Sequence, residues 1–269
     1  MRDCWPLMSD QKDEIVEAAA EVVVIQTPEE TVVRKTVVVT RRELPANGPL
    51  EAFTSLLPII TVAIFIITFL AQPYRIPSGS MENTLLVGDF LLVNKQIYAP
   101  GGAWRWLMPY RNPRRGDIIV FHNPLDANDH LVKRTIAQPG ERIRLRGGRV
   151  LINSQPIDEP YAIYIPSRPD HFRDNFPTLH DADPEIDAQW WMQMRTLIDN
   201  GDLILPTGNY FMMGDNRNNS RDSRYWGFMP REFAEGMPML VYFSVPAPEE
   251  QQRGIHGLAR WSRMFTIPR

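Results

Sequence analysis

A serine set between small and rigid residues is the first candidate for chemistry in this sequence. Ser80 stands in Ile76-Pro77-Ser78-Gly79-Ser80-Met81, where Gly79 leaves room for a substrate backbone. The Ser80 hydroxyl could attack a carbonyl, and its N–H and the Ser78 hydroxyl could stabilise the resulting oxyanion. Serines flanked by proline and glycine are more often ordinary loop residues. Ser80 therefore needs a base nearby to count as a nucleophile.

Lysine is the candidate base, because no histidine is suitably placed. Lys133 lies in the apolar run Leu131–Ile136, and a buried lysine loses its charge more readily. Its neighbour Arg134 stays charged and is a poorer base, and Lys95 looks more solvated. The alternative for Lys133 is the exposed face of an edge strand. The histidines occur singly and without metal-ligand spacing, so we expect no metal site and no cofactor: His122, His130, His171, His180 and His256.

A dense polar run could hold such a pair in place. Residues 214–224 read GDNRNNSRDSR, between the apolar run Tyr210–Met213 and the aromatic run Tyr225–Phe228. Runs rich in Asn and Asp are most often turns. Here apolar residues on both sides would fix the loop, and a fixed polar loop can orient catalytic groups through hydrogen bonds.

The elements that must position these residues are mainly β-strands. The sequence has short β-branched runs separated by glycine and proline turns, which predicts a mostly β domain with non-local pairing. The predicted strands are Phe90–Asn94, Asp117–Phe121, Leu131–Ala137, Arg149–Ile152, Tyr210–Met213 and Met239–Phe243. Residues 155–207 differ in composition and are interpreted as an insertion, with a helix near Ala188–Ile198.

One segment is far more apolar than the rest. Residues 53–71 contain no charged side chain, and a helix of that length spans roughly the apolar thickness of a bilayer. Four basic residues lie in the 20 residues before it and one in the 20 after it, which predicts an N-terminus on the cytoplasmic side. A buried core helix and a cleaved signal peptide are the alternatives. The predicted organisation is a cytoplasmic tail at 1–52, a transmembrane helix at 53–71 and an external domain at 72–269. The tail is expected to be weakly ordered, with helical propensity at Asp13–Glu21 and strand-like runs at Thr31–Val33 and Val37–Val39.

The charge of the chain argues against one class of partner. Of 269 residues, 29 are Lys or Arg and 32 are Asp or Glu, so the formal net charge is −3. Neutralising phosphates requires a clustered positive excess, and therefore no nucleic-acid partner is expected. The single cysteine, Cys4, cannot form an internal disulfide.

Together the three polar blocks resemble the type I (leader) signal peptidases, which are bacterial Ser/Lys membrane proteases. The resemblance rests on PSGSM-x-x-TL-x-x-GDF, GDI-x-VF, KR-x-I-x-x-PG and GNYFMMGDNRNNSRDSRYWGF, in that order behind an apolar segment. It implies an antiparallel β catalytic core with an inserted β extension. It also implies the removal of signal peptides from exported preproteins after small residues at positions −3 and −1.

The resemblance assigns a role to each motif position. It implies Ser80 as nucleophile, Lys133 as general base and Ser78 in the oxyanion hole. Ser220 is implied to hydrogen-bond Lys133, and Asp222 and Arg224 to form a supporting salt bridge. The expected substrate-binding residues are Tyr74, Ile76, Pro77, Met81, Leu85, Leu131 and Val132.

The expected partners are signal peptides and membrane lipid, at the external face of a bacterial cytoplasmic membrane. Four aromatic residues are candidates for contact with lipid, with ordinary core packing as an equal alternative for each: Trp104, Trp106, Trp261 and Phe265. The sequence leaves the oligomeric state open. It also leaves alternatives for the function: a dedicated processing peptidase of a conjugation or pilus system, a repressor-type Ser/Lys autoprotease, and an inactive binding module. The last is disfavoured because a binding role needs none of Ser80, Lys133 and Ser220.

Overall fold

The structure is a computed structural model that describes residues 16–26, 31–41, 49–66, 71–98, 110–180, 183–247 and 259–269. The chain divides into two compact units, residues 1–62 and residues 63–269. The candidate chemistry lies entirely in the second unit.

The first unit contains an antiparallel hairpin. Strand β1 (Val16–Gln26) pairs with β2 (Thr31–Arg41), with Val16 opposite Arg41. The strand prediction within Thr31–Val39 is confirmed. The helix expected near Asp13–Glu21 is wrong from Val16 onward, because backbone pairing along both strands outweighs the helical propensity of the alanines. The weak order of the tail stays a prediction.

Helix α1 (Pro49–Phe65) covers most of the apolar segment, but its ends differ from the prediction. It begins before residue 53, and Ala71 already belongs to strand β3 (Ala71–Arg75). Residues 67–70 of the predicted span lie outside the described residues. No helix among the residues that the structure describes is long and apolar enough to cross a membrane.

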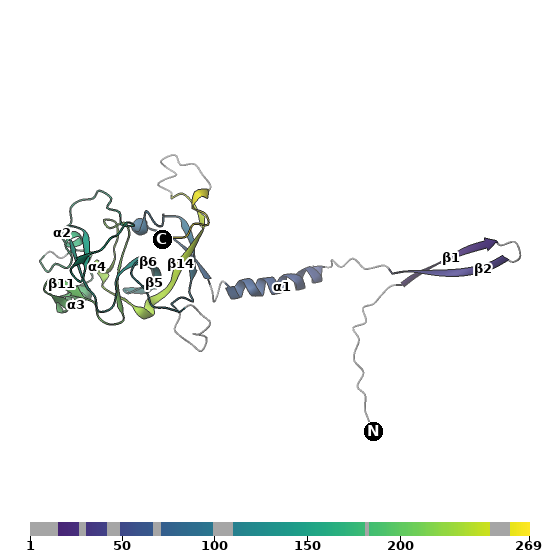
Figure 1. Cartoon of the computed structure of the whole chain (residues 1–269), viewed down its shortest axis with the longest axis horizontal. Coiled ribbons are helices and arrows are strands. Elements are labelled where there is room, and N and C mark those ends of the chain that lie inside the picture. The colour runs from purple at the N-terminus through teal and green to yellow at the C-terminus, as the bar shows by residue number, and fades with distance from the viewer. Residues whose placement is uncertain are drawn as a thin grey trace, which may run out of the picture. The chain divides into compact units, whose positions relative to one another are not determined.

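A seven-stranded antiparallel sheet forms the centre of the second unit (Figure 1), in the order β13-β12-β6-β5-β14-β4-β3. Every strand predicted for it is present, with ends that differ by a few residues. Its further strands are β4 (Asp89–Asn94), β5 (Ile118–Asn123), β6 (Asp126–Ala137), β12 (Asn209–Met213), β13 (Met229–Pro230) and β14 (Ala234–Ser244). Strand β6 lies inside this sheet, between β5 and β12, and not at its edge.

A second sheet of five strands is inserted between β6 and β12. Its order is β10-β11-β7-β8-β9, and Figure 1 shows helices α2, α3 and α4 gathered beside β11. The extension begins earlier than predicted, because the β7–β8 hairpin before residue 155 belongs to the same sheet. Its elements are β7 (Arg142–Arg146), β8 (Arg149–Ile152), β9 (Gln155–Pro156), α2 (His171–Asp174), α3 (Ala188–Leu197), β10 (Ile198–Asp199) and β11 (Asp202–Ile204).

Short turns complete the unit. They are η2 (Gly79–Met81), α4 (Ser223–Trp226), η3 (Arg231–Phe233) and η4 (Trp261–Arg263). Two of them carry candidate residues: η2 holds Ser80, and α4 follows the polar loop. The predicted helix near Ala188–Ile198 is confirmed by α3, whose Asp187 side chain accepts a hydrogen bond from the Trp190 N–H and caps the first turn.

Two apolar clusters support the elements around the candidate residues. One cluster lies beneath η2 and includes Met81, Leu85 and Val120, all almost completely buried. The other joins the extension to the polar loop, with Trp190, Phe211 and Tyr225 among its members. Close packing on both sides limits how far the serine turn and the polar loop can move.

Candidate active site

The nucleophile candidate sits on a turn that is fixed at both ends. Ser80 lies in η2 and is only 8% exposed, while its neighbour Met81 is buried in the apolar cluster below. The Met81 carbonyl accepts a hydrogen bond from the Leu85 N–H at 2.8 Å, and the Ser80 carbonyl accepts one from the Asn216 N–H at 3.1 Å. The serine backbone is therefore held by its own turn and by the polar loop.

Lys133 lies directly beside this serine. Its Nζ atom donates a hydrogen bond to Ser80 Oγ at 2.6 Å, and its side chain is nearly completely buried. The lysine stands on β6 opposite Ile119 of β5, inside the sheet. The alternative of an exposed lysine on an edge strand is wrong.

Burial changes the proton affinity of this amine. Loss of hydration lowers the pKa of Lys133 to about 8. The charge of Asp222 opposes this shift, the charge of Arg224 adds to it, and Asp215 opposes it again. A substantial fraction of the lysine is therefore neutral near physiological pH, and a neutral amine can accept the Ser80 proton.

The predicted oxyanion donor is close to the nucleophile. Ser78 Oγ lies 3.4 Å from Ser80 Oγ, and Ser78 itself is exposed. Its hydroxyl is free to rotate towards a bound carbonyl. The geometry is compatible with the predicted role.

A salt bridge stabilises the polar loop from within. Arg224 donates to Asp222 from Nε and from Nη2, both at 2.8 Å, and both residues are almost completely buried. Asp222 also accepts a hydrogen bond from the Gly214 N–H at 3.1 Å. Burial raises the pKa of Asp222, but Arg224 and Lys133 outweigh it, so the net shift is downward. The carboxylate stays ionised and can support the loop, as predicted.

A second buried pair connects the loop to β6. Arg134 donates to Asp215 from Nε at 2.8 Å and from Nη2 at 2.7 Å. The Arg134 guanidinium also lies over the Tyr161 ring, 4.0 Å from its centre. Because Arg134 follows Lys133 in the chain, this pair fixes the strand next to the candidate base.

Ser220 differs from the prediction. It is buried beside Gly214, but its hydroxyl has no hydrogen-bond partner among the described residues. The expected hydrogen bond to Lys133 is therefore not formed. Because Gly214 also lies against the Ser80 carbonyl, Ser220 is close to Ser80 without a hydrogen bond to Lys133.

A cleft of about 440 Å³ opens beside Ser80 and Lys133. Six of the seven predicted substrate-binding residues line it: Tyr74, Ile76, Pro77, Met81, Leu131 and Val132. Leu85 does not, because it is completely buried in the apolar cluster. The sequence analysis missed four further lining residues, Arg75, Asn128, Asp129 and His130. Three of them belong to the first part of β6, which extends before the predicted start at Leu131.

The sequence profile described as "Signal peptidase, peptidase S26" matches residues 50–243. The chain belongs to this family. It is thus a serine peptidase and a hydrolase. The matched region contains Ser80, Lys133 and the whole polar loop.

Named relatives of this peptidase cover most of its length. It is 34% identical over 208 residues to the signal peptidase I of Pseudomonas fluorescens, covering 72% of each chain. It is 36% identical over 209 residues to that of Leptolyngbya laminosa, covering 74% of this chain and 83% of the relative. A solved signal peptidase I from Enterococcus faecalis is 32% identical, with a TM-score of 0.34, covering 47% of this chain and 97% of the other.

Proposed function

We propose that this peptidase uses Ser80 as nucleophile and Lys133 as general base to remove signal peptides from exported preproteins. The observation that carries the proposal is the 2.6 Å contact between Lys133 Nζ and Ser80 Oγ, at a lysine with a lowered pKa. The named relatives, all signal peptidase I, support the choice of substrate.

The proposed reaction has two halves. In the first, neutral Lys133 takes the Ser80 proton as Ser80 Oγ attacks the scissile carbonyl, and the Ser80 N–H and Ser78 hydroxyl stabilise the oxyanion. Lys133 then protonates the leaving amine, which leaves an ester on Ser80. In the second half, Lys133 deprotonates a water molecule that attacks the ester. It then returns this proton to Ser80 Oγ as the ester bond breaks and the signal peptide is released. Serine, lysine and water supply every proton, so these steps need no cofactor.

Cleavage after small residues at −3 and −1 is proposed from the resemblance to the type I signal peptidases. The lining of the cleft supports it, because Ile76, Met81 and Val132 are apolar and Tyr74 lines the same cleft. Met81 belongs to the apolar cluster below the cleft, and Val132 packs against that cluster. Because close-packed side chains fill this floor, the proposal is that small substrate side chains are favoured above it.

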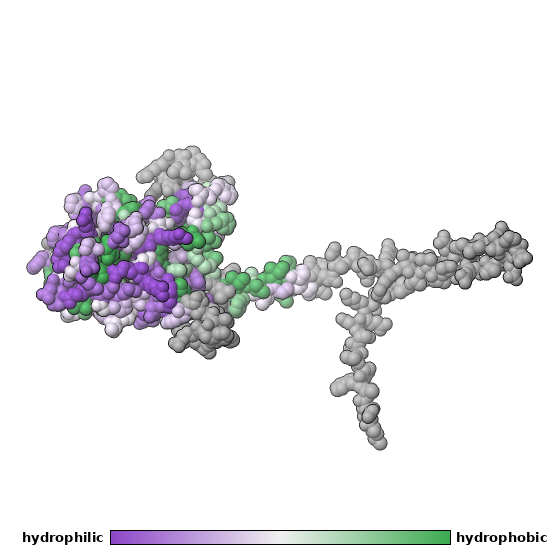
Figure 2. Space-filling model, in the orientation of Figure 1, coloured by the Kyte–Doolittle hydropathy of each residue, from purple (hydrophilic) through white to green (hydrophobic). Residues whose placement is uncertain are grey.

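Membrane anchoring through residues 53–71 is also part of the proposal. Most described side chains of α1 are apolar and all are exposed, for example Leu57 at 54% and Ile59 at 64%, and Figure 2 shows hydrophobic surface along part of this helix. In the second unit, Trp261 is 76% exposed and Phe265 is 74% exposed, which suits contact with lipid. Trp104 and Trp106 lie outside the described residues. The basic residues before residue 53 favour a catalytic unit on the external side. A topology reporter at the C-terminus that is active only in the cytoplasm would contradict this orientation.

The deciding experiment is cleavage of a secretory precursor with an Ala-x-Ala site by the full-length protein in detergent, with mass spectrometry of the products. Lys133→Ala should not cleave, whereas the matched control Lys35→Ala, in the first unit, should cleave like the wild type. No cleavage by folded wild type would favour a narrow-substrate processing peptidase. Equal cleavage by Lys133→Ala would remove this lysine from the mechanism.

A further inference from the structure

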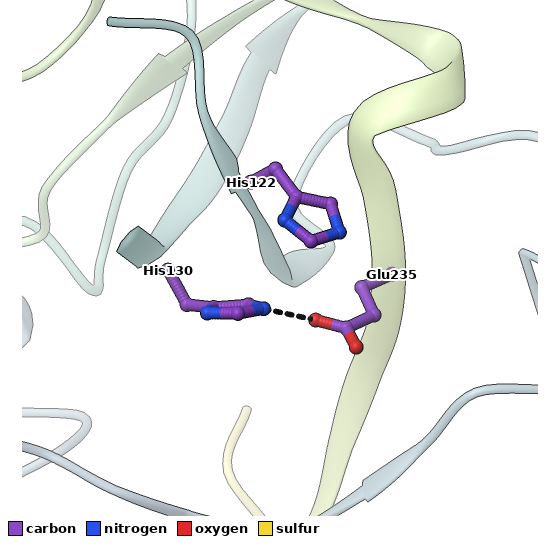
Figure 3. A group of neighbouring side chains, drawn as sticks. All are labelled: His122, His130 and Glu235. Atoms are coloured by element: carbon purple, nitrogen blue, oxygen red, sulfur yellow. Dashed lines mark ion pairs between the residues drawn. The ribbon is translucent and has the colours of Figure 1, made fainter. Parts of the chain in front are cut away.

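Two histidines and a glutamate meet at one end of the cleft (Figure 3). His122 on β5 stands directly opposite His130 on β6, and Glu235 projects from the adjacent strand β14. The three residues can offer ligand atoms that all lie within 4.8 Å of one another. Sequence spacing did not reveal this group, because hairpin register and pairing with a third strand bring it together.

The separations are close to those of a metal site. His130 Nε2 lies 3.1 Å from Glu235 Oε2. In a tetrahedral zinc site with bonds of about 2.0–2.1 Å, ligand atoms lie roughly 3.3–3.4 Å apart. The His122 and His130 rings are 4.7 Å apart between their centres, so small side-chain rotations would complete the arrangement. The backbone can stay in place because all three residues stand on paired strands.

Neighbouring groups already orient two of the ligands. His122 Nδ1 lies 3.1 Å from the Ala127 carbonyl, which can only accept, so Nδ1 carries the hydrogen and Nε2 keeps its lone pair. Lys95 Nζ lies 3.2 Å from Glu235 Oε1 and leaves Oε2 for a metal. Hydrogen bonds from outer groups of this kind are the usual support of histidine and carboxylate ligands.

The donor set indicates which ion fits. Two imidazoles and one carboxylate suit zinc-type transition metals, whereas magnesium and calcium prefer oxygen ligands alone. The Glu235 side chain is 12% exposed and that of His130 is 32% exposed, so the group is sheltered but reachable from water. The ordinary alternative is a hydrogen-bonded His–Glu pair without an ion.

We propose that His122, His130 and Glu235 form a Zn²⁺ site with a fourth position for water, at the end of the substrate cleft. His130 lines the cleft, and its ring lies 5.6 Å from that of Tyr74, another lining residue. A bound ion would hold the β5–β6 hairpin to β14 at this end. Zinc binding does not depend on the proposed peptidase substrate, so the two proposals can fail separately.

The test is titration of the untagged, metal-free, full-length protein in detergent with Zn²⁺ by calorimetry, and with Co²⁺ by visible absorption. We expect one Zn²⁺ per chain and the intense bands of tetrahedral Co²⁺. Affinity should fall at least tenfold in His130→Ala and in Glu235→Gln, and should not change in His180→Ala, an exposed histidine outside the group. Circular dichroism checks that each variant is folded, and His122→Ala replaces any variant that is not.

Three results would overturn the proposal. The first is the absence of saturable binding by the wild type. The second is a Zn²⁺ affinity equal to that of the wild type in folded His130→Ala and in folded Glu235→Gln. The third is binding that disappears in Cys4→Ser but persists in His130→Ala, since the thiol would then be the ligand. A rise in the unfolding temperature with Zn²⁺ in the wild type, absent in Glu235→Gln, would support the site independently of any peptidase assay.

Discussion

The amine of Lys133 lies 2.6 Å from the hydroxyl of Ser80, although the lysine stands on β6 and the serine on the turn after β3. The contact depends on two separate supports. Sheet pairing places the lysine inside the unit, while the polar loop and the apolar cluster below hold the serine turn. A change in either support should therefore affect activity without removing a reacting group.

Replacing Lys133 with methionine should abolish cleavage and stabilise the fold at neutral pH. The unfolded chain has a lysine pKa near 10.5 and the folded protein one of about 8, so charging the buried amine disfavours the folded state below pH 8. The charged amine thus lowers the free energy of unfolding by about 3 kcal/mol at most, and this effect fades between pH 8 and 10.5. Thermal unfolding at pH 7 and pH 10 measures it. A methionine variant less stable than wild type at pH 7 would show that the lysine contributes more by packing than its charge costs.

The activity of the wild type should rise with pH through about 8 and then level off, because only the neutral amine accepts the serine proton. Asp222→Asn removes a negative charge that raises the pKa of Lys133, so the rise should move to lower pH. The rate of precursor cleavage as a function of pH measures both effects. An unchanged midpoint in a folded Asp222→Asn protein would show that Asp222 does not influence the base.

Much of this site could be predicted from sequence, because the motifs are local. The turn around Ser80 depends on a short segment whose residue types limit the backbone, and the Asp222–Arg224 pair was implied by the family resemblance of the polar loop. The core strands were also predicted, since β-branched runs between turns carry a clear signal. The pairing between segments that are far apart in the chain could not be predicted from the sequence.

Three particular cases show this limit. The extension was expected to begin at residue 155, because the sequence of the β7–β8 hairpin does not reveal that β11 pairs with β7. The family resemblance implied Leu85 at the cleft, but an apolar residue near the serine can face either substrate or the core, and Leu85 faces the core. His122 and His130 looked unrelated, because hairpin register and not sequence spacing sets them opposite each other.

Ser78→Ala should lower kcat by roughly 100-fold, the usual cost of losing one oxyanion donor, with little change in KM. Ser78 is exposed and its hydroxyl faces Ser80 Oγ at 3.4 Å, so the unfolding temperature should not change. Steady-state kinetics with a precursor peptide measures the two constants. If the variant keeps the kcat of the wild type, the Ser80 N–H is the main oxyanion donor and the Ser78 hydroxyl is not required.

Gly214→Ala should inactivate the enzyme by displacing the serine turn. A Cβ at this position would overlap the Ser80 carbonyl oxygen and the Ser220 side chain, and neither the backbone nor the buried serine can move away easily. The matched control is Gly140→Ala, where the backbone φ of +83° is strained for alanine but no atom lies within 4 Å of the new Cβ. The control should lose some stability and keep its activity. Full activity of Gly214→Ala would show that the loop can shift without moving Ser80.

Ser220→Ala tests a hydroxyl that is buried without a hydrogen-bond partner among the described residues. Burying an unpaired polar group costs stability, so its removal should leave the unfolding temperature unchanged or raise it. If the hydroxyl bonds the lysine only when substrate is bound, kcat should fall about tenfold, because a misplaced base transfers protons less well. Kinetics and thermal unfolding on the same sample separate the two effects. Unchanged kcat together with a higher unfolding temperature would mean that Ser220 does not orient Lys133. A lower kcat at equal or higher stability would show that Ser220 positions Lys133 during the reaction.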